Sequence, residues 1–251
     1  MKSVAVIGAA GFVGSQIASH ITKSQEYELV PLVRGDDLSA GIKRSDIVVH
    51  AANSGKRFYA ENTPYEDFLD NVEKTARISE YARHARLILV SSISARTQLD
   101  TVYGRNRRSC ELIVGNTNSL IVRLGPMFGA GKSVGALSDL LENRKVYVAG
   151  STRYAYVDVG YNAKKITSYL GDEELLGCIE LGAKTGICLR ELRDLIGSTS
   201  LFEGQDDTQI PVPPPADAPG VEDVIAYVGS LRDSTHKDKG VARIEERETE
   251  C

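Results

Sequence analysis

The sequence predicts an α/β fold, built on a doubly wound parallel sheet with a smaller C-terminal lobe. Short apolar, β-branched runs alternate with stretches of helical periodicity through the first half of the chain, as in repeated βα units. The first run, Val4–Ile7, ends in a glycine-rich turn, Gly8–Gly14, that opens a helix. A hydrophobic content of 42% and a charged content of 25% are typical of a globular chain that can bury a core.

The glycine-rich turn has the spacing G-x-x-G-x-x-G. A strand, such a turn and a helix place backbone N–H groups and the positive helix end against a pyrophosphate. Gly8 permits the tight turn, Gly11 leaves room for phosphates, and Gly14 allows close packing of helix and strand. The turn therefore predicts a dinucleotide site, with no ligand as the alternative. Its expected residues are Gly8, Ala10, Gly11, Phe12, Val13 and Gly14.

The next elements continue the alternation, and the helix after the turn runs to about Lys23. The remaining elements expected in this half are strand Glu28–Val33, strand Ile47–His50, helix Glu66–His84, strand Leu87–Val90, helix Tyr103–Val114 and strand Ser119–Leu124. Pro31 is compatible with the second strand only at an edge or bend. In such a sheet, ligands bind at the carboxyl ends of the strands.

After Gly125 the composition changes. We expect a helix at Ser133–Asn143, strands at Lys145–Val148 and Tyr154–Val159, a helix at Leu189–Ile196, and an extended, proline-rich connector at 210–215. From Arg232 the chain is charged and polar, as in a surface tail. We therefore assign residues 1–130 to the dinucleotide-binding domain, with 154–170 returning to it. Residues 131–251 form the smaller substrate-binding lobe with its tail.

The end of the second expected strand selects the cofactor. An acidic side chain there accepts a hydrogen bond from the ribose 2′-hydroxyl of NAD, whereas an arginine accommodates the 2′-phosphate of NADP. Arg34 directly follows this strand, which predicts NADP(H) over NAD(H). The alternative is that Asp36 or Asp37 binds the ribose and Arg34 is solvated.

Net charge and composition limit the partners and the compartment that we expect for this protein. A net charge of −4 gives no case for a nucleic-acid partner or an anionic membrane. The four cysteines are scattered, the four histidines lack metal-ligand spacing, and no apolar run approaches the ~20 residues that span a bilayer. The N-terminus leads directly into a strand, so no signal peptide is expected. We expect a cytoplasmic protein with a small-molecule substrate, no metal, and a homodimer as a possible assembly.

Several further motifs follow in order along the chain. They are Asp46–Ala52, Asn71–Thr75 (N-V-x-x-T), Val90–Ser92, Tyr103–Arg107 in place of Y-x-x-x-K, Glu111, and Arg123–Gly129 (R-x-G-x-x-x-G). Together with the glycine turn, they resemble the extended short-chain dehydrogenases/reductases, which include nucleotide-sugar epimerases, dehydratases and ketoreductases. The resemblance covers about Met1 to Val159 and implies a Rossmann-type fold.

The resemblance implies three catalytic residues. Tyr103 acts as general acid or base, Arg107 lies one helical turn away and lowers the pKa of the phenol, and Ser92 binds the reacting oxygen. Ser94 is the alternative hydroxyl. The family has lysine where this chain has Arg107, and an arginine is bulkier and never gives up its proton. Slowed or lost activity is therefore the alternative outcome.

The resemblance also implies contacts with the bound molecules. Cofactor contacts are expected from Ala51, Ala52, Asn71, Tyr103 and Arg107, and substrate contacts from Ser92, Asn53 and Arg153. Arg153 precedes a Y-V-D-V segment, where an arginine can bind a substrate phosphate in bidentate fashion. A surface charge is the alternative for this residue.

These features predict an NAD(P)(H)-dependent oxidoreductase, a ketoreductase acting on a nucleotide-linked keto-sugar. A 4,6-dehydratase is disfavoured, because Ile93-Ser94-Ala95-Arg96 follows Ser92 without the acid pair that such chemistry needs. The alternatives are a nucleotide-sugar epimerase and a non-catalytic protein that binds or senses NADP(H).

Overall fold

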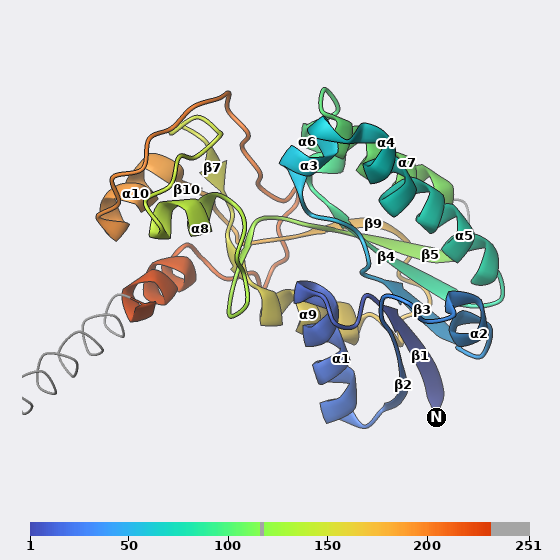
Figure 1. The fold of residues 1–251 in the computed structure, drawn as a ribbon. Coiled ribbons are helices and arrows are strands. Elements are labelled where there is room, and N and C mark those ends of the chain that lie inside the picture. Colours follow the sequence, from blue (N-terminus) through green and yellow to red (C-terminus); the bar gives the residue numbers. More distant parts are fainter. Residues whose placement is uncertain (116–117, 232–251) are drawn as a thin grey trace, which may run out of the picture.

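The computed structural model of the chain describes residues 1–115 and 118–231. Its centre is a six-stranded parallel sheet with the order β2-β1-β3-β4-β5-β9 (Figure 1). The strands are β1 (Lys2–Ile7), β2 (Tyr27–Leu32), β3 (Ile47–His50), β4 (Arg86–Ser92), β5 (Ser119–Leu124) and β9 (Gly177–Leu181). The chain moves outward from β1 to β2 and then crosses back to β3. This order confirms the predicted doubly wound, Rossmann-type sheet and creates a switch point at β1 and β3, where ligands bind.

Helices cover both faces of the sheet, as a parallel sheet requires. On one face, α1 (Phe12–Ser24) packs against α9 (Val159–Ser168) (Figure 1). Val4 and Val6 point into this layer with Ile17 and Ile166. The opposite face is covered by α2 (Leu38–Lys43), the π-helical turn η1 (Leu69–Glu73), α5 (Lys74–Tyr81) and α7 (Val102–Val114). Three short helices pack against α7, namely α3 (Arg57–Asn62), α4 (Pro64–Phe68) and α6 (Ser94–Thr97).

The C-terminal lobe has an apolar core of its own, around Leu140, Tyr154, Leu192 and Val224. Its elements are α8 (Ala136–Leu141), β7 (Arg153–Tyr154), β10 (Ile187–Cys188), α10 (Leu189–Ile196) and the helical residues 222–231. β7 pairs with β10, and β6 (Met127–Phe128) pairs with β8 (Val157–Asp158). The lobe lies beside the carboxyl ends of the central strands (Figure 1).

Two predicted strands are wrong in part. Lys145–Val148 forms only an isolated bridge between Val146 and Phe202, because the partner segment turns at Gly204, whose φ is 128°. Tyr154–Val159 holds only the last residue of β7 and the two residues of β8, and Val159 already begins α9.

The chain crosses between the sheet and the lobe more than once. β9 falls within the range assigned to the C-terminal lobe, yet it pairs with β5 as the sixth strand of the main sheet. The chain therefore enters the lobe, returns to the sheet, and enters the lobe again. The expected polar tail from Arg232 lies outside the described residues. Within residues 1–115 and 118–231, no helix is long and apolar enough to cross a membrane.

Candidate active site

The glycine turn after β1 is pressed between helix α1 and the segment after β3. Gly8 has a φ of 85°, a conformation that favours glycine, and a Cβ there would lie 2.8 Å from the Cα of Ala52. A Cβ on Gly14 would lie 2.1 Å from the carbonyl oxygen of Gly8. Only glycine at these two positions allows the strand, the turn and the helix to approach this closely. Ala51 is tied to β1 by its N–H, which donates to the Ile7 carbonyl at 2.9 Å.

The start of α1 is suited to a phosphate. The helix begins at Phe12, has no side-chain cap and carries no acidic residue in its first turn. The first N–H groups of a helix lack intrahelical partners and carry the positive end of the helix dipole. A Cβ on Gly11 would have a single neighbour within 4 Å, the Gly8 carbonyl oxygen at 3.2 Å. The N-terminus of α1 therefore fits the pyrophosphate of a dinucleotide.

Helix α7 delivers Tyr103 to the end of β4. The helix starts after Thr101, whose side-chain oxygen accepts a hydrogen bond from the Gly104 N–H at 2.9 Å. A Cβ on Gly104 would lie 1.9 Å from the carbonyl oxygen of Gln98, so glycine permits the close approach of α7 to the preceding turn. Tyr103 is buried as a result, with 6% of its surface exposed.

The structure brings Tyr103, Arg107 and Ser92 together. The guanidinium carbon of Arg107 lies 5.0 Å from the centre of the Tyr103 ring. Burial raises the pKa of the Tyr103 phenol, but the positive charges of Arg107 and Arg57 and the interaction with the Ser92 hydroxyl outweigh it. The pKa of Tyr103 is therefore lowered, as a tyrosine acid–base requires.

Arg107 is also held by the loop after β3. Its Nη2 donates to the carbonyl oxygen of Ser54, and its Nε is buried without a hydrogen-bond partner among the described residues. The Ser54 N–H donates to Oδ1 of Asn71 at 2.9 Å, and Nδ2 of Asn71 donates to the Asp67 carbonyl at 2.8 Å. Asn71 thus fixes the loop that positions Arg107.

Ser92 is the more accessible of the two candidate hydroxyls. Its side chain is half-buried, and its Oγ lies 3.2 Å from the Oγ of Ser94. Ser94 is fully buried and accepts hydrogen bonds from Arg57 at 3.2 Å and from Gln209 at 3.3 Å. Asn53 lies nearby, where Nδ2 donates to the Val90 carbonyl at 3.4 Å and Oδ1 is buried without a partner among the described residues.

His50 is a neutral side chain at the end of β3. Its Nε2 lies 3.0 Å from the Thr75 hydroxyl, which itself donates to the Asn71 carbonyl at 2.6 Å. We therefore assign the proton to Nε2, which leaves Nδ1 to accept from the Ala52 N–H at 3.4 Å. Burial, and then the charges of Lys74 and Arg107, lower the pKa of His50 to about 3.

The end of β2 carries an exposed Arg34. Both neighbouring carboxylates are engaged locally: Asp36 accepts from the Val33 N–H at 2.7 Å, and Asp37 caps α2 by accepting from the Ala40 N–H at 3.1 Å. Lys74, which is half-buried, adds positive charge nearby. Burial is the main cause that lowers the pKa of Lys74. The charge of Asp70 raises this pKa, and the charges of Arg107 and Arg34 lower it. The carboxylates of Asp36 and Asp37 are therefore bonded to the local backbone, and Lys74 brings a second cation near Arg34.

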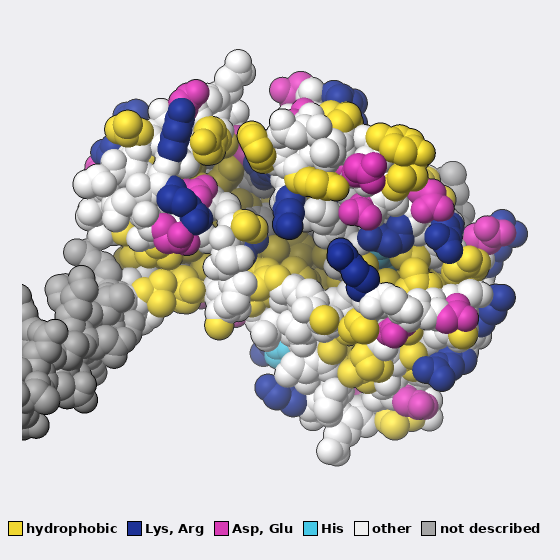
Figure 2. Space-filling view, viewed as in Figure 1, with side chains coloured by type: hydrophobic (Ala, Val, Ile, Leu, Met, Phe, Trp, Pro, Cys, Tyr) yellow, Lys and Arg dark blue, Asp and Glu magenta, His cyan; other side chains and the backbone are white. Residues whose placement is uncertain are grey.

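Three charged residues near Tyr103 escaped the sequence analysis. The guanidinium carbon of Arg57 lies 5.8 Å from the centre of the Tyr103 ring, and Arg57 is paired with Asp207 of the C-terminal lobe. Nζ of Lys132 lies 5.0 Å from the centre of the Phe12 ring. Burial lowers the pKa of Lys132, against the raising effect of Tyr103. Figure 2 shows Lys and Arg side chains on both sides of the hollow between the lobe and the sheet.

A second ionic cluster holds α7 against the sheet. Glu111 accepts hydrogen bonds from Ser91 at 2.7 Å and from Arg123 at 2.6 and 2.8 Å. Arg123 also contacts Glu180 of β9 at 3.2 Å, and Glu180 binds Arg96 at 2.8 Å. The pairing of Glu111 with Arg123 therefore orients α7, the helix that carries Tyr103.

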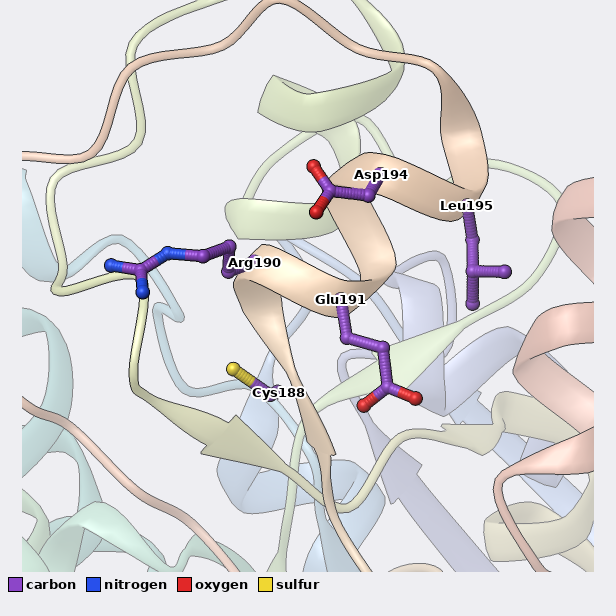
Figure 3. A pocket seen from close by; sticks show the side chains of 5 residues that line it. All are labelled: Cys188, Arg190, Glu191, Asp194 and Leu195. Atoms are coloured by element: carbon purple, nitrogen blue, oxygen red, sulfur yellow. The ribbon is translucent and has the colours of Figure 1, made fainter.

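Arg153 is not among the groups around Tyr103. It lies on β7 with an exposed side chain that donates to the Gly186 carbonyl at 2.5 Å. Its neighbour Tyr154 faces the opposite side and donates to Asp207. A depression of about 640 Å³ on the C-terminal lobe, lined by Cys188, Arg190, Glu191, Asp194 and Leu195, contains none of the expected site residues (Figure 3).

Comparisons with known proteins bear on the family and the fold. Residues 4–119 match the profile of the NAD dependent epimerase/dehydratase family, which confirms the predicted resemblance. No match was found among curated proteins.

Solved structures with the same fold cover three reaction types. An NAD-dependent NDP-hexosamine 5,6-dehydratase, TunA, is 13% identical over 84% of this chain and 86% of its own, with a TM-score of 0.71. A dTDP-4-dehydrorhamnose reductase from Bacillus anthracis in complex with NADP is 15% identical over 83% and 90%, with a TM-score of 0.69. A UDP-glucose 4-epimerase from Thermus thermophilus in complex with NAD is 18% identical over 90% and 93%, with a TM-score of 0.67. At these identities the likeness establishes the fold alone.

Proposed function

We propose that the chain is an NADP(H)-dependent ketoreductase that acts on a nucleotide-linked keto-sugar. The observation that carries this proposal is the buried Tyr103, flanked by the Arg107 guanidinium at 5.0 Å and by Ser92, at the carboxyl ends of the strands. The glycine turn and the open start of α1 lie at the same edge of the sheet. A proton donor with a lowered pKa beside a dinucleotide site is what a carbonyl reduction needs.

Three residues have distinct roles in the proposed carbonyl reduction. When bound, the nicotinamide supplies the hydride. The phenol of Tyr103 donates a proton to the carbonyl oxygen of the sugar, and the Ser92 hydroxyl holds that oxygen by a hydrogen bond. The fixed charge of Arg107 stabilises the phenolate that remains. The Arg107 guanidinium also offers donors to the cofactor ribose.

Charge favours an anionic substrate. Arg57, Arg107 and Lys132 surround the tyrosine, and Asp207 neutralises only Arg57 in the described structure. Buried cations require an anion or a strong hydrogen-bonding partner. The diphosphates of the cofactor and of a nucleotide sugar meet this need, and the solved relatives act on such sugars by their names.

Reduction is favoured over dehydration because Ser92 is followed by Ile93 and Ser94 rather than by an acid pair. NADP is favoured over NAD because the carboxylates of Asp36 and Asp37 are engaged by backbone N–H groups, which leaves Arg34 to meet the ribose.

The test is a spectrophotometric scan of the purified protein with NADPH and NADH against keto-sugar nucleotides. The proposal predicts oxidation of NADPH with at least one of them. Interconversion of nucleotide sugars without net oxidation of the cofactor would identify an epimerase instead. Tight cofactor binding without any turnover would identify a non-catalytic binding protein.

A further inference from the structure

A buried carboxylate of the C-terminal lobe reaches across to the acid–base site. Asp207 is 8% exposed and lies 150 residues from Arg57 in the sequence. Four described side chains donate to its carboxylate, namely Arg57, Gln98, Tyr154 and Gln209, the last at 3.1 and 3.2 Å. A buried carboxylate is tolerated only when it is paired and hydrogen-bonded to this degree.

Arg57 connects this carboxylate to the catalytic hydroxyls. One guanidinium nitrogen binds Asp207, and the other donates to Ser94 Oγ at 3.2 Å. Ser94 Oγ in turn lies 3.2 Å from Ser92 Oγ. The guanidinium carbon of Arg57 is 5.8 Å from the centre of the Tyr103 ring. Arg57 therefore stands beside the phenol as a charge whose position is set by its two partners.

We propose that Arg57 is a second cationic positioning residue for Tyr103, and that Asp207 of the C-terminal lobe holds it there, so that the acid–base site is complete only across both parts of the fold. The assignment of proton transfer to Tyr103 rests on the proposed function. The ionisation of Tyr103 can nevertheless be measured without cofactor or substrate, so the two proposals can fail separately.

Several elements bring charged groups to the phenol or to its cationic partners. They are Arg107 of α7, Arg57 of α3 and Lys132 of the loop after β6, with Asp207 and Tyr154 behind Arg57, and His50 and Lys74 behind Arg107. Arg107 and Arg57 both lower the pKa of Tyr103. Opposite charges within about 4–6 Å typically lower a pKa by roughly 1–3 units. Burial raises the pKa of Tyr154, so its titration does not overlap that of Tyr103.

The role of Asp207 has a distinctive sign. If Asp207 were merely a negative charge near the site, its removal would make the phenolate easier to form and lower the pKa of Tyr103. If it holds Arg57 in place, its removal frees the guanidinium and raises that pKa. The two readings therefore predict opposite shifts.

The experiment is an ultraviolet difference titration of tyrosine ionisation in the full chain, with Tyr103→Phe subtracted to isolate Tyr103. Arg57→Met is expected to raise the pKa of Tyr103 by roughly one unit, and Arg57→Lys to restore most of the shift. Asp207→Asn is expected to raise it in the wild-type background but not in the Arg57→Met background. The control is Arg105→Met, at an exposed residue of α7, the helix that carries Tyr103. This variant should leave the pKa of Tyr103 unchanged.

The double variant Arg57→Met/Asp207→Asn removes both charges and avoids an unpaired buried carboxylate, so it guards against misfolding of the single variants. It should show the same raised pKa as Arg57→Met. A Tyr103 pKa that is unchanged by Arg57→Met, or one that falls in Asp207→Asn, would overturn the proposal.

Discussion

The guanidinium carbon of Arg107 lies 5.0 Å from the centre of the Tyr103 ring, one turn further along α7. The same guanidinium donates to the Ser54 carbonyl, so the arginine is fixed between the tyrosine and the loop after β3. A lysine at this position would supply the same charge from a thinner, more flexible side chain. The arginine therefore keeps the electrostatic role and adds a fixed orientation.

This relationship predicts the effects of changing Arg107. Arg107→Lys should keep or raise activity, because the charge remains near the phenol. Arg107→Met should weaken cofactor binding and lower the rate by roughly tenfold or more, because it removes both the charge and the ribose donors. Steady-state rates and cofactor titrations of the two variants provide the check. Equal behaviour of the Met and Lys variants would show that the charge of Arg107 is not used.

Arg34 should set the cofactor preference. We expect tighter binding of NADP(H) than of NAD(H), and Arg34→Ala should remove the difference, at a cost to NADP(H) of ~10-fold or more, since charge-assisted hydrogen bonds are lost. Fluorescence titration with NADPH and NADH measures both affinities. The exposed Arg44 at the end of α2, changed to Ala, is the matched control and should alter neither affinity. Tighter NADH binding that is insensitive to Arg34→Ala would refute the preference.

The glycine turn gives a contrast between two substitutions. Gly11 has a φ of −79°, and its Cβ would meet only the Gly8 carbonyl oxygen, at 3.2 Å, so Gly11→Val should still fold after a small local shift. It should nevertheless raise the Kd for the cofactor by ~100-fold or more, because the side chain fills the phosphate site. Gly14→Val should unfold the chain, because its Cβ would lie 2.1 Å from the Gly8 oxygen. Melting curves and cofactor titrations separate the two effects. Normal cofactor binding by a folded Gly11→Val variant would show that the cofactor phosphate does not bind at this turn.

His50 should make stability depend on pH. Its pKa is lowered from 6.5 to about 3 by burial, so between these values the unfolded chain binds a proton that the folded chain does not. Stability therefore falls as the pH falls through this window, by about 2 kcal/mol between pH 7 and pH 5 for this residue. Urea unfolding at both values should show a drop smaller by about that amount in His50→Gln. The same pH dependence in both proteins would show that His50 is not the group responsible.

The sequence predicted the sheet through Ser119–Leu124, because each strand there is a short apolar run that periodicity detects. β9 was missed because its buried Glu180 breaks the apolar pattern, and only the pairing with Arg96 and Arg123 makes that burial possible. The order of motifs likewise predicted Ser92, Tyr103 and Arg107, because these residues lie on consecutive parts of one βα unit.

The rest of the site could not be predicted in this way. Arg57 and Asp207 meet only because the C-terminal lobe folds back to the site, and neither stands in a distinguishing motif. Lys132 reaches Phe12 across 120 positions of the chain, and only the tertiary structure shows this contact. Long-range charge pairing leaves no local pattern in a single sequence.

The most direct test of the central claim compares wild type and Tyr103→Phe in one assay of NADPH oxidation by a keto-sugar nucleotide. The phenol contributes the proton and little of the cofactor affinity, so Tyr103→Phe should lose ~10²–10⁴-fold in rate while its Kd for NADPH stays near that of wild type. A Tyr103→Phe enzyme that retains most of the wild-type rate would contradict the account, since another group would then carry the proton.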